Sequence, residues 1–548
     1  MKAARQAMLD TITTGLTAAR ATRADSWAES YRVMGEPYPG PFTFDYHPWT
    51  REMLCDDTEE CVGQKAAQMG FTDSVAMTRA FYTLDKLKRD VLYVLPAKTP
   101  DATDFSAARF DPALERSPYL ANLFTNVNNV GLKRAGANSL YVRGSRSRSA
   151  LKSLPVGLIV NDEEDEFDQA AIILVRERIT GQREGARQIW HISTPSIPGR
   201  GINLTFNQST QAHYFFPCPH CTFEGKPRII EFLFPDSLQI MGTDPITSEP
   251  LAEYICHHCK NVIVQEEKIL ALREGQWVHR VASHIHGYQI SQMYSPVITA
   301  SNFQRAVTRS ETSPAEEQEF HNNKLGEDHI VEGAAITEAH IDACIEDYKM
   351  NDPKKMKGLI TMGVDVGSKL HVEVDQWNIF SKNSIDLNDN ARPNVVLATT
   401  VDTFDEIANL LYLYQPAMCV IDREPETRQA MSLARRYPGR VKLCKYTTHP
   451  QDLSIFDERV NANRTAWLDK ALGRVITGMI ALPKDIPEEW RTQISNLVRI
   501  PGKDPLGNPV YRYENRGPDH SAHARNYAEI ALGCIDIGEN RQMQERTN

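Results

Sequence analysis

Short apolar runs bounded by polar or glycine-containing turns recur in both halves of the chain. They cover residues 91–95, 156–160, 188–192, 359–364 and 418–421. Runs of this length without strict alternation are typical of strands buried on both faces, as in parallel sheets. An amphipathic stretch with apolar residues at helical spacing, 75–87, comes directly before the first run. The pattern predicts an α/β protein.

A glycine-containing loop precedes the predicted helix. Gly70 and Thr72 occupy the positions of the last glycine and the hydroxyl residue in the pattern G-x-x-x-x-G-K-[ST], whose backbone N–H groups point at phosphates. Phe71 stands where that pattern has its lysine, and Lys65 stands where it has its first glycine. The order of loop, helix and strand is the one that an ATP-binding site needs.

An acidic run follows the apolar segment 156–160. Asp162 is a candidate for holding Mg²⁺ and Glu163 for activating the attacking water, the two carboxylate roles in phosphoryl transfer. The alternative is a solvated acidic turn. The position of the run after a buried strand favours an ATPase. Thr194 follows the strand 188–192 and is a candidate for sensing the γ-phosphate, or else a turn cap.

Length and charge limit the possible functions. The chain has 548 residues, of which 41% are hydrophobic and 24% charged, so several domains are expected. No apolar run approaches the roughly 20 residues of a membrane span, and no secretory signal is expected. The net charge of −10 excludes attraction of the whole protein to DNA. Nucleic-acid binding would therefore depend on local basic surfaces.

Four of the ten cysteines form two C-x₂-C pairs, Cys218 with Cys221 and Cys256 with Cys259. Four thiolates in this arrangement predict a structural Zn²⁺ site. The long separation between the pairs requires an inserted pair of strands. Reduced thiols packed without metal are the alternative.

Two apolar strands of the second half carry an aspartate at their ends, Asp365 and Asp422. Buried strands that deliver two carboxylates to one place form the basis of an RNase H-like nuclease. Two divalent ions, Mg²⁺ or Mn²⁺, would clamp the attacking and leaving oxygens of a phosphodiester there. The structural alternative is a turn or a helix cap.

The order of these motifs resembles the large subunit of tailed-phage terminases, in particular the group related to the phage lambda large terminase. The resemblance implies a P-loop ATPase of the ASCE type with a mostly parallel sheet, a small zinc-ribbon-like insertion and an RNase H-like nuclease domain. The expected division is a helical lead-in at 1–45, the ATPase domain at 46–210, the insertion and a helical linker at 211–350, the nuclease domain at 351–535 and a tail at 536–548.

The resemblance also implies roles for individual residues. Lys65 would reach over the loop to the β- and γ-phosphates, and Glu163 would be the catalytic base. The expected ATP-binding residues are Lys65, Gln68, Gly70, Phe71, Thr72, Asp162 and Thr194. An arginine finger is expected in addition, with Arg143, Arg146, Arg148 and Arg200 as unranked candidates.

The third nuclease ligand departs from the family pattern. The family has an acid on a C-terminal helix, four residues before a Tyr-Ala pair, where this chain has His523. Asp519 lies one turn earlier on the same helical face. Either His523 binds the metal, or Asp519 does so after a small shift of the helix. A histidine ligand would favour Mn²⁺ over Mg²⁺ and would make cleavage sensitive to pH near neutrality.

The function implied by the resemblance is ATP-driven translocation of double-stranded DNA into procapsids, with cutting of concatemeric DNA. The expected partners are a small terminase subunit, the portal protein and further copies of the chain in a ring. The expected location is the host cytoplasm and transiently the procapsid portal, not the mature virion. Two alternatives remain. One is a helicase-like or restriction-type translocating ATPase, and the other is a non-enzymatic zinc-containing nucleic-acid binder.

Overall fold

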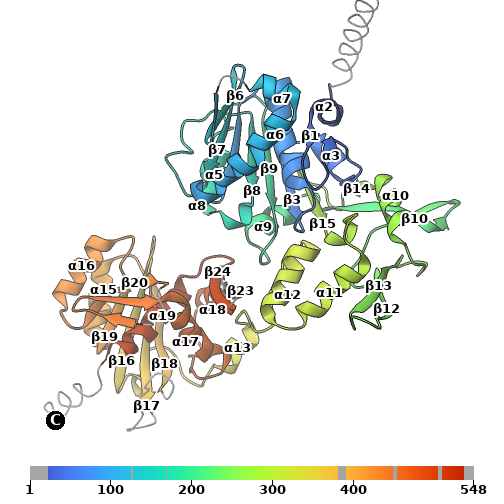
Figure 1. Cartoon of the computed structure of the whole chain (residues 1–548). Coiled ribbons are helices and arrows are strands. Elements are labelled where there is room, and N and C mark those ends of the chain that lie inside the picture. Colours follow the sequence, from blue (N-terminus) through green and yellow to red (C-terminus); the bar gives the residue numbers. More distant parts are fainter. Residues whose placement is uncertain are drawn as a thin grey trace, which may run out of the picture. The chain divides into compact units, whose positions relative to one another are not determined.

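The computed structural model describes residues 22–124, 127–167, 169–379, 391–448, 453–503 and 509–535 (Figure 1). The chain divides into two compact units, Met1–His329 and Ile330–Asn548, and each is described by itself. The expected segment 211–350 is shared between these units. The expected tail 536–548 lies outside the described residues, as do residues 1–21 of the expected lead-in 1–45.

The segment 22–54, which contains the described part of the lead-in and the start of the expected ATPase domain, packs onto the phosphate loop and the helix after it. Its elements are α2 (Ala24–Tyr31), β1 (Val33–Met34), β2 (Gly40–Pro41) and α3 (Thr50–Leu54). The indole N–H of Trp27 donates to Asp85 Oδ2 at 2.8 Å, and that of Trp49 donates to the Met69 carbonyl at 2.9 Å. Both indoles are fully buried, so this segment is part of the core of unit 1.

The sheet of unit 1 has the mostly parallel arrangement that the sequence predicts. Its strands are β3 (Glu60–Lys65), β4 (Val91–Leu95), β5 (Val127–Asn129), β6 (Leu132–Ala135), β7 (Asn138–Gly144), β8 (Leu158–Asp162), β9 (Gln188–Ser193), β10 (Ala212–Phe223), β11 (Lys226–Ile230), β14 (Gln276–Val278) and β15 (Ile285–Ile290). The order is β11-β10-β15-β3-β9-β8-β4-β7-β6-β5, with β14 also paired to β10. The six strands from β15 to β7 are parallel, which confirms the fold class.

Helices cover both faces of this sheet (Figure 1). The segment after the phosphate loop is helical from η1 (Phe71–Met77) through α4 (Thr78–Tyr82) to η2 (Thr83–Leu87); the others are η3 (Lys98–Ala102), α5 (Thr103–Phe105), η4 (Ser106–Phe110), α6 (Asp111–Arg116), α7 (Pro118–Leu123), η5 (Glu164–Glu166), α8 (Gln169–Arg176) and α9 (Gly201–Asn207). In β4, Tyr93 belongs to the apolar cluster that contains Phe81, whereas Leu92 and Val94 belong to the cluster that contains Val175. Burial on both faces explains why the strand is apolar throughout.

The cysteine pairs flank the predicted pair of inserted strands, β12 (Leu238–Thr243) and β13 (Pro250–Tyr254), which pair antiparallel. The insertion is continuous with the central sheet, because β10 and β15 join its edge. The remaining elements of unit 1 are α10 (Gln265–Arg273), η6 (Gln292–Tyr294), α11 (Ala300–Ser310), α12 (Pro314–Phe320) and η7 (His321–Leu325).

Unit 2 contains a mixed sheet in the order β18-β17-β16-β19-β20-β22-β21. Its elements are α13 (Glu338–Ala343), η8 (Pro353–Lys355), β16 (Leu359–Val366), β17 (Leu370–Ile379), β18 (Ala391–Val401), α15 (Phe404–Tyr414), β19 (Met418–Asp422), α16 (Thr427–Arg436), β20 (Val441–Thr447), β21 (Leu453–Ile455), β22 (Arg459–Asn463), α17 (Arg464–Ile476), α18 (Glu488–Ser495), β23 (Leu497–Lys503), β24 (Pro509–Asn515) and α19 (His520–Gly533). The strands β16, β19, β20 and β22 are parallel, and β17 and β18 extend the sheet antiparallel.

Helix α19 is fixed on this sheet by close backbone contact and by buried charges. A Cβ added to Gly363 of β16 would lie 2.1 Å from the Ala524 carbonyl oxygen, so only glycine permits this approach. The fully buried Arg525 guanidinium bonds to Glu373 at 2.8 Å and to Glu529 at 2.7 Å, and also contacts Asp375. Residues at the start of α19 are therefore held against β16. Within the described residues, no helix has the length and apolar character to cross a membrane.

Candidate functional sites

The phosphate loop and the acidic run meet at the carboxyl ends of β3 and β8. Lys65 Nζ lies 3.4 Å from Glu163 Oε1, and the Thr72 hydroxyl donates to Asp162 Oδ1 at 3.3 Å. Lys65 ends β3, and Asp162 ends β8; β9 lies between these parallel strands. The structure thus brings together four residues that the sequence assigns to ATP hydrolysis. Carboxyl ends of parallel strands are also where α/β sheets bind ligands.

The two carboxylates of this site have different surroundings. Asp162 is buried, and the Tyr93 hydroxyl donates to its Oδ2 at 2.6 Å. Burial raises the pKa of Asp162 to about 6, and the neighbouring Glu163 carboxylate contributes to this rise, against the opposing effect of Lys65. The Glu163 side chain is 44% exposed and its backbone is left-handed, with φ of 59°. Asp162 and Thr72 offer oxygen ligands that suit Mg²⁺, while Glu163 remains accessible to solvent.

The loop conformation explains the displaced lysine. The Phe71 side chain is fully buried beneath β3, where a Cβ on Gly63 would lie 2.8 Å from the phenyl ring. A lysine at position 71 would carry its charge into this apolar core. Phe71 therefore offers only its backbone to a nucleotide, and the cation comes from Lys65. Gly70 has φ of +80°, which favours glycine, and Gln68 is exposed beside it.

The segment after β9 is connected to the acidic run through Asp165, which is not among the predicted ATP-binding residues. Ser193 Oγ accepts from the Asp165 backbone N–H at 3.1 Å, and Ser196 Oγ donates to the Asp165 carboxylate. Asp165 Oδ1 also accepts from the Ile202 N–H at 3.0 Å at the start of α9. Thr194 is half-buried, and its carbonyl accepts from Ser193 Oγ at 3.0 Å.

The arginine candidates differ in their contacts. Arg143 donates to the Val142 carbonyl at 2.9 Å and to the Gly131 carbonyl, and it lies over the Tyr141 ring. Arg146 and Arg148 are exposed, whereas Arg200 is half-buried and its charge acts on Asp165. Arg143 is therefore used in the local fold, and Arg146 and Arg148 remain the exposed candidates.

A segment near the end of unit 1 is hydrogen-bonded to the phosphate loop. The Ala66 N–H donates to the Ile290 carbonyl at 3.0 Å, and the Ala67 N–H donates to the Asn323 carbonyl at 2.9 Å. The Gln64 side-chain amide donates to the Gly326 carbonyl at 3.0 Å. The first residues of the loop are thus positioned by β15 and by the turn that follows η7.

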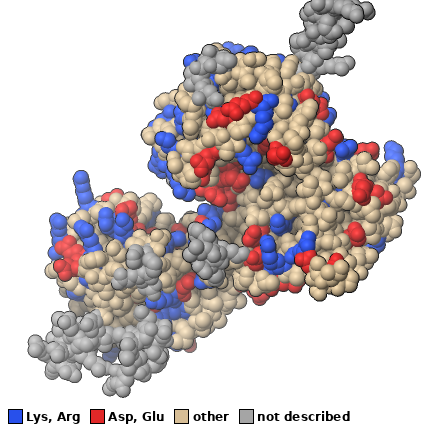
Figure 2. All heavy atoms as spheres, in the orientation of Figure 1, with Lys and Arg blue, Asp and Glu red and all other residues tan. Residues whose placement is uncertain are grey.

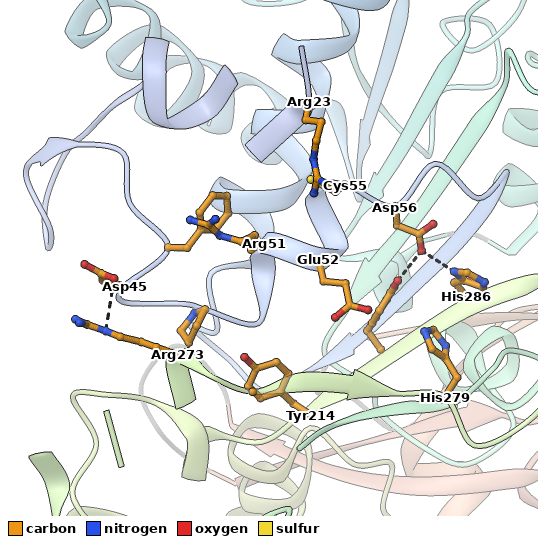
Figure 3. A pocket seen from close by; sticks show the side chains of 14 residues that line it. Arg23, Asp45, Arg51, Glu52, Cys55, Asp56, Tyr214, Arg273, His279 and His286 are labelled. Carbon is orange, nitrogen blue, oxygen red and sulfur yellow. Dashed lines mark hydrogen bonds and ion pairs between the residues drawn. The ribbon is translucent and has the colours of Figure 1, made fainter. Parts of the chain in front are cut away.

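A cavity of about 580 Å³ beside α3 is not the ATP site (Figure 3). Arg51 and Arg273 lie at one side of it, and Asp56 and His286 lie at the other, joined by a 2.8 Å contact. Asp56 precedes the amino end of β3, whereas Lys65 ends the same strand. None of the predicted ATP-binding residues lines this cavity.

The four predicted zinc ligands converge. The Sγ atoms of Cys218, Cys221, Cys256 and Cys259 all lie within 4.8 Å of one another. The Cys221 and Cys256 sulfurs are 3.9 Å apart, close to the roughly 3.8 Å that tetrahedral Zn–S bonds of about 2.3 Å require. The His220 backbone N–H donates to Cys218 Sγ at 3.5 Å. This donor set fits a closed structural Zn²⁺ site. In the described part of the chain, no other group of three or more His, Cys, Asp or Glu donors is as compact.

Asp365 and Asp422 stand on neighbouring parallel strands of unit 2. Val364 of β16 is opposite Ile421 of β19, so the two aspartates that follow lie at the same level, on strands about 4.8 Å apart. Burial raises the pKa of Asp422 to about 6; Asp365 contributes to this rise, and the Glu424 N–H and His523 oppose it. Two carboxylates this close together fit a shared divalent cation, which would relieve their repulsion.

The two predicted candidates for a third ligand contact each other. His523 Nε2 lies 3.4 Å from Asp519 Oδ2, and His523 Nδ1 lies 3.0 Å from the Tyr446 hydroxyl. The Asn526 side-chain amide also donates to this hydroxyl at 2.9 Å. A different histidine, His520, contacts the carboxylate of Asp365, with Nδ1 at 2.8 Å from Oδ2. In the sequence, only the position of His520, one residue after Asp519 in the predicted helix, could have indicated that it lies near the nuclease site.

Residues 37–277 match a family model described as the phage terminase large subunit gpA, ATPase domain. Among the curated proteins, none matches the chain. Among solved structures, the HK97 bacteriophage large terminase is similar, with a TM-score of 0.53 and 10% identity, over 93% of this chain and 99% of that chain.

Two further large terminases match less well. One is a large terminase from a thermophilic bacteriophage, with a TM-score of 0.31 and 10% identity over 87% of this chain and 95% of that chain. The other is the nuclease from thermophilic phage G20c, with a TM-score of 0.23 and 15% identity over 35% of this chain and 95% of that chain. Residues 37–277 are thus similar to the ATPase domain of the phage terminase large subunit, and the chain as a whole has the fold of the HK97 large terminase.

Proposed function

We propose that this chain is a terminase large subunit that couples ATP hydrolysis to the translocation of double-stranded DNA into procapsids and cuts concatemeric DNA with a metal-dependent nuclease. The observation that carries this proposal is the meeting of Lys65 with Glu163, and of Thr72 with Asp162, at one edge of a parallel sheet. A lysine, a hydroxyl and two carboxylates in this arrangement are the groups that ATP hydrolysis requires.

In the ATPase site, each residue has a distinct task. Thr72 and Asp162 would hold the Mg²⁺ that neutralises charge on the phosphates. Lys65 exchanges its contact with Glu163 for the β- and γ-phosphates when ATP binds. This exchange frees the Glu163 carboxylate to accept a proton from the attacking water. An exposed arginine, Arg146 or Arg148, of the same or a neighbouring subunit supplies further positive charge to the transition state.

In the nuclease site, Asp365 and Asp422 would hold two divalent cations, Mg²⁺ or Mn²⁺, that activate the nucleophile and stabilise the leaving oxygen. Asp519 or His523 was expected to complete the ligands. The helix that follows Asp422 carries exposed arginines at 428, 435 and 436, and Figure 2 shows basic side chains over this part of unit 2. Arginines on a helix contact DNA phosphates without reading sequence, so this binding weakens as salt concentration rises.

The partners follow from the packaging role. Sequence choice comes from a small terminase subunit, and docking comes from the portal protein of the procapsid, on which the chain forms a homo-oligomeric ring. The protein acts in the host cytoplasm and transiently at the portal, and it is absent from the mature virion. Structural Zn²⁺ at the four cysteines stabilises the insertion.

Two single variants of the full chain test this function. Glu163→Ala is expected to abolish ATP hydrolysis and to retain plasmid nicking with Mn²⁺, because the nuclease carboxylates are untouched. Asp422→Ala is expected to do the reverse. Loss of both activities in either correctly folded variant, or retention of ATPase activity in Glu163→Ala, would contradict two separate sites with these residues.

A further inference from the structure

We infer that His520, and not His523 or Asp519, supplies the side chain on α19 that binds the nuclease metal together with Asp365. The inference rests on the proposed nuclease function and assigns its missing ligand. It departs from the spacing argument, which aligns position 523 with the family's acid. The contacts of the three side chains distinguish them.

His520 is directed at a carboxylate of the proposed metal site. Its Nδ1 atom lies 2.8 Å from Asp365 Oδ2, and its side chain is 39% exposed, so solvent and ions reach it. Its ring stacks on the His371 ring, with centroids 4.7 Å apart and an interplanar angle of 14°. His371 is paired with Asp365 across β16 and β17, so the same strand pair positions both the carboxylate and the imidazole.

His523 and Asp519 are already engaged with other groups. Tyr446 and Asp519 occupy the two ring nitrogens of His523, at 3.0 and 3.4 Å. The Asn526 amide donates to the Tyr446 hydroxyl, so this hydroxyl can donate its proton to His523 Nδ1, which places the ring proton on Nε2 toward Asp519. Only 12% of the His523 side chain and 14% of the Asp519 side chain are exposed. A metal at His523 would require these contacts to break.

This arrangement assigns the three side chains different tasks. His520 offers an imidazole nitrogen next to Asp365, and imidazole ligands favour Mn²⁺ and similar ions over Mg²⁺. His523 is a positioning residue, because its contact with the Tyr446 hydroxyl joins α19 to β20.

Binding of Mn²⁺ alone to the full chain, without nucleotide or DNA, tests the assignment. Electron spin-echo measurements on bound Mn²⁺ detect a directly coordinated nitrogen through its nuclear modulation. We expect this modulation in the wild type, its loss in His520→Ala with at least tenfold weaker Mn²⁺ binding, and its retention in His523→Ala with a change below about threefold. His520→Asp is expected to bind Mn²⁺ without nitrogen modulation and to gain Mg²⁺-dependent nicking.

The outcomes separate the ligand assignment from the proposed nuclease site. Nitrogen modulation that persists in His520→Ala, or that disappears in His523→Ala alone, would overturn the assignment to His520 and leave the nuclease proposal standing. Unchanged Mn²⁺ binding in Asp422→Asn would contradict the nuclease site itself and with it this inference. Circular dichroism and retained ATPase activity establish that each variant is folded.

Discussion

Replacement of Gly326 by alanine tests whether the turn after η7 positions the phosphate loop. Gly326 has φ of +68°, and an added Cβ would lie 2.5 Å from the Ala66 nitrogen and 2.8 Å from both the Ile290 oxygen and the Lys65 carbonyl carbon. All three atoms belong to backbone, so no side chain can rotate away. The loop or the turn must move to accommodate the methyl group.

The expected magnitude has two parts. A left-handed backbone costs alanine about 1–2 kcal/mol, and overpacking in a tight region costs a further ~1–3 kcal/mol. Gly326→Ala is therefore expected to lower the free energy of unfolding of unit 1 by roughly 2–5 kcal/mol. Gly136 is a matched control, because its φ is +63° and nothing lies within 4 Å of an added Cβ. Gly136→Ala is expected to lower the free energy of unfolding only by the backbone cost, about 1–2 kcal/mol.

The assay combines urea denaturation with ATPase kinetics on the full chain. Since the crowded atoms adjoin Lys65, Gly326→Ala is expected to raise KM for ATP at least severalfold, whereas Gly136→Ala leaves it unchanged. Equal stability and equal KM in the two variants would refute the conclusion that this turn positions the loop.

Two further predictions concern stability. Removal of Zn²⁺ by a chelator, or Cys256→Ser, is expected to lower Tm and to release about one Zn²⁺ per chain, measured by metal analysis; a chain that contains no Zn²⁺ when purified would contradict the site. Burial alone would lower the pKa of His191, but Glu164 and Glu60 outweigh it and raise the pKa to about 9 from 6.5. Protonated His191 therefore stabilises the folded state fully below pH 6.5, and this contribution to the free energy of unfolding is lost as pH rises through 9. This loss is about 3 kcal/mol. In urea denaturation at a series of pH values, His191→Gln is expected to lack this decline in the free energy of unfolding. The same decline with pH in the variant and in the wild type would contradict the prediction.

The displaced lysine shows which features of the ATP site a local sequence pattern can predict. The positions of Gly70 and Thr72, the apolar helix after them and the acidic run at Asp162 predict a phosphate loop, and the family resemblance implies the role of Lys65. The pattern did not reveal why position 71 is phenylalanine. That reason is tertiary: the ring fills the space under Gly63 of β3.

The nuclease helix shows what residue spacing along the chain leaves open. Counting back from Tyr527 selected His523, and helical periodicity added Asp519, because both criteria use separation along the chain alone. The contact of His520 with Asp365 depends on how α19 lies on β16, which close packing at Gly363 and the buried Arg525 cluster determine. The orientation of α19 on β16 cannot be predicted from residue spacing in the sequence.

The α/β class, the two apolar strands that carry Asp365 and Asp422, and the convergence of four cysteines can be predicted from the amino-acid sequence, because strand burial and ligand spacing are properties of short segments. The tertiary structure alone decided that β10 and β15 extend the ATPase sheet, that the turn at Gly326 contacts Lys65, and which histidine contacts Asp365. These are contacts between segments distant in the chain, and they depend on how helices and strands pack, which local periodicity does not encode.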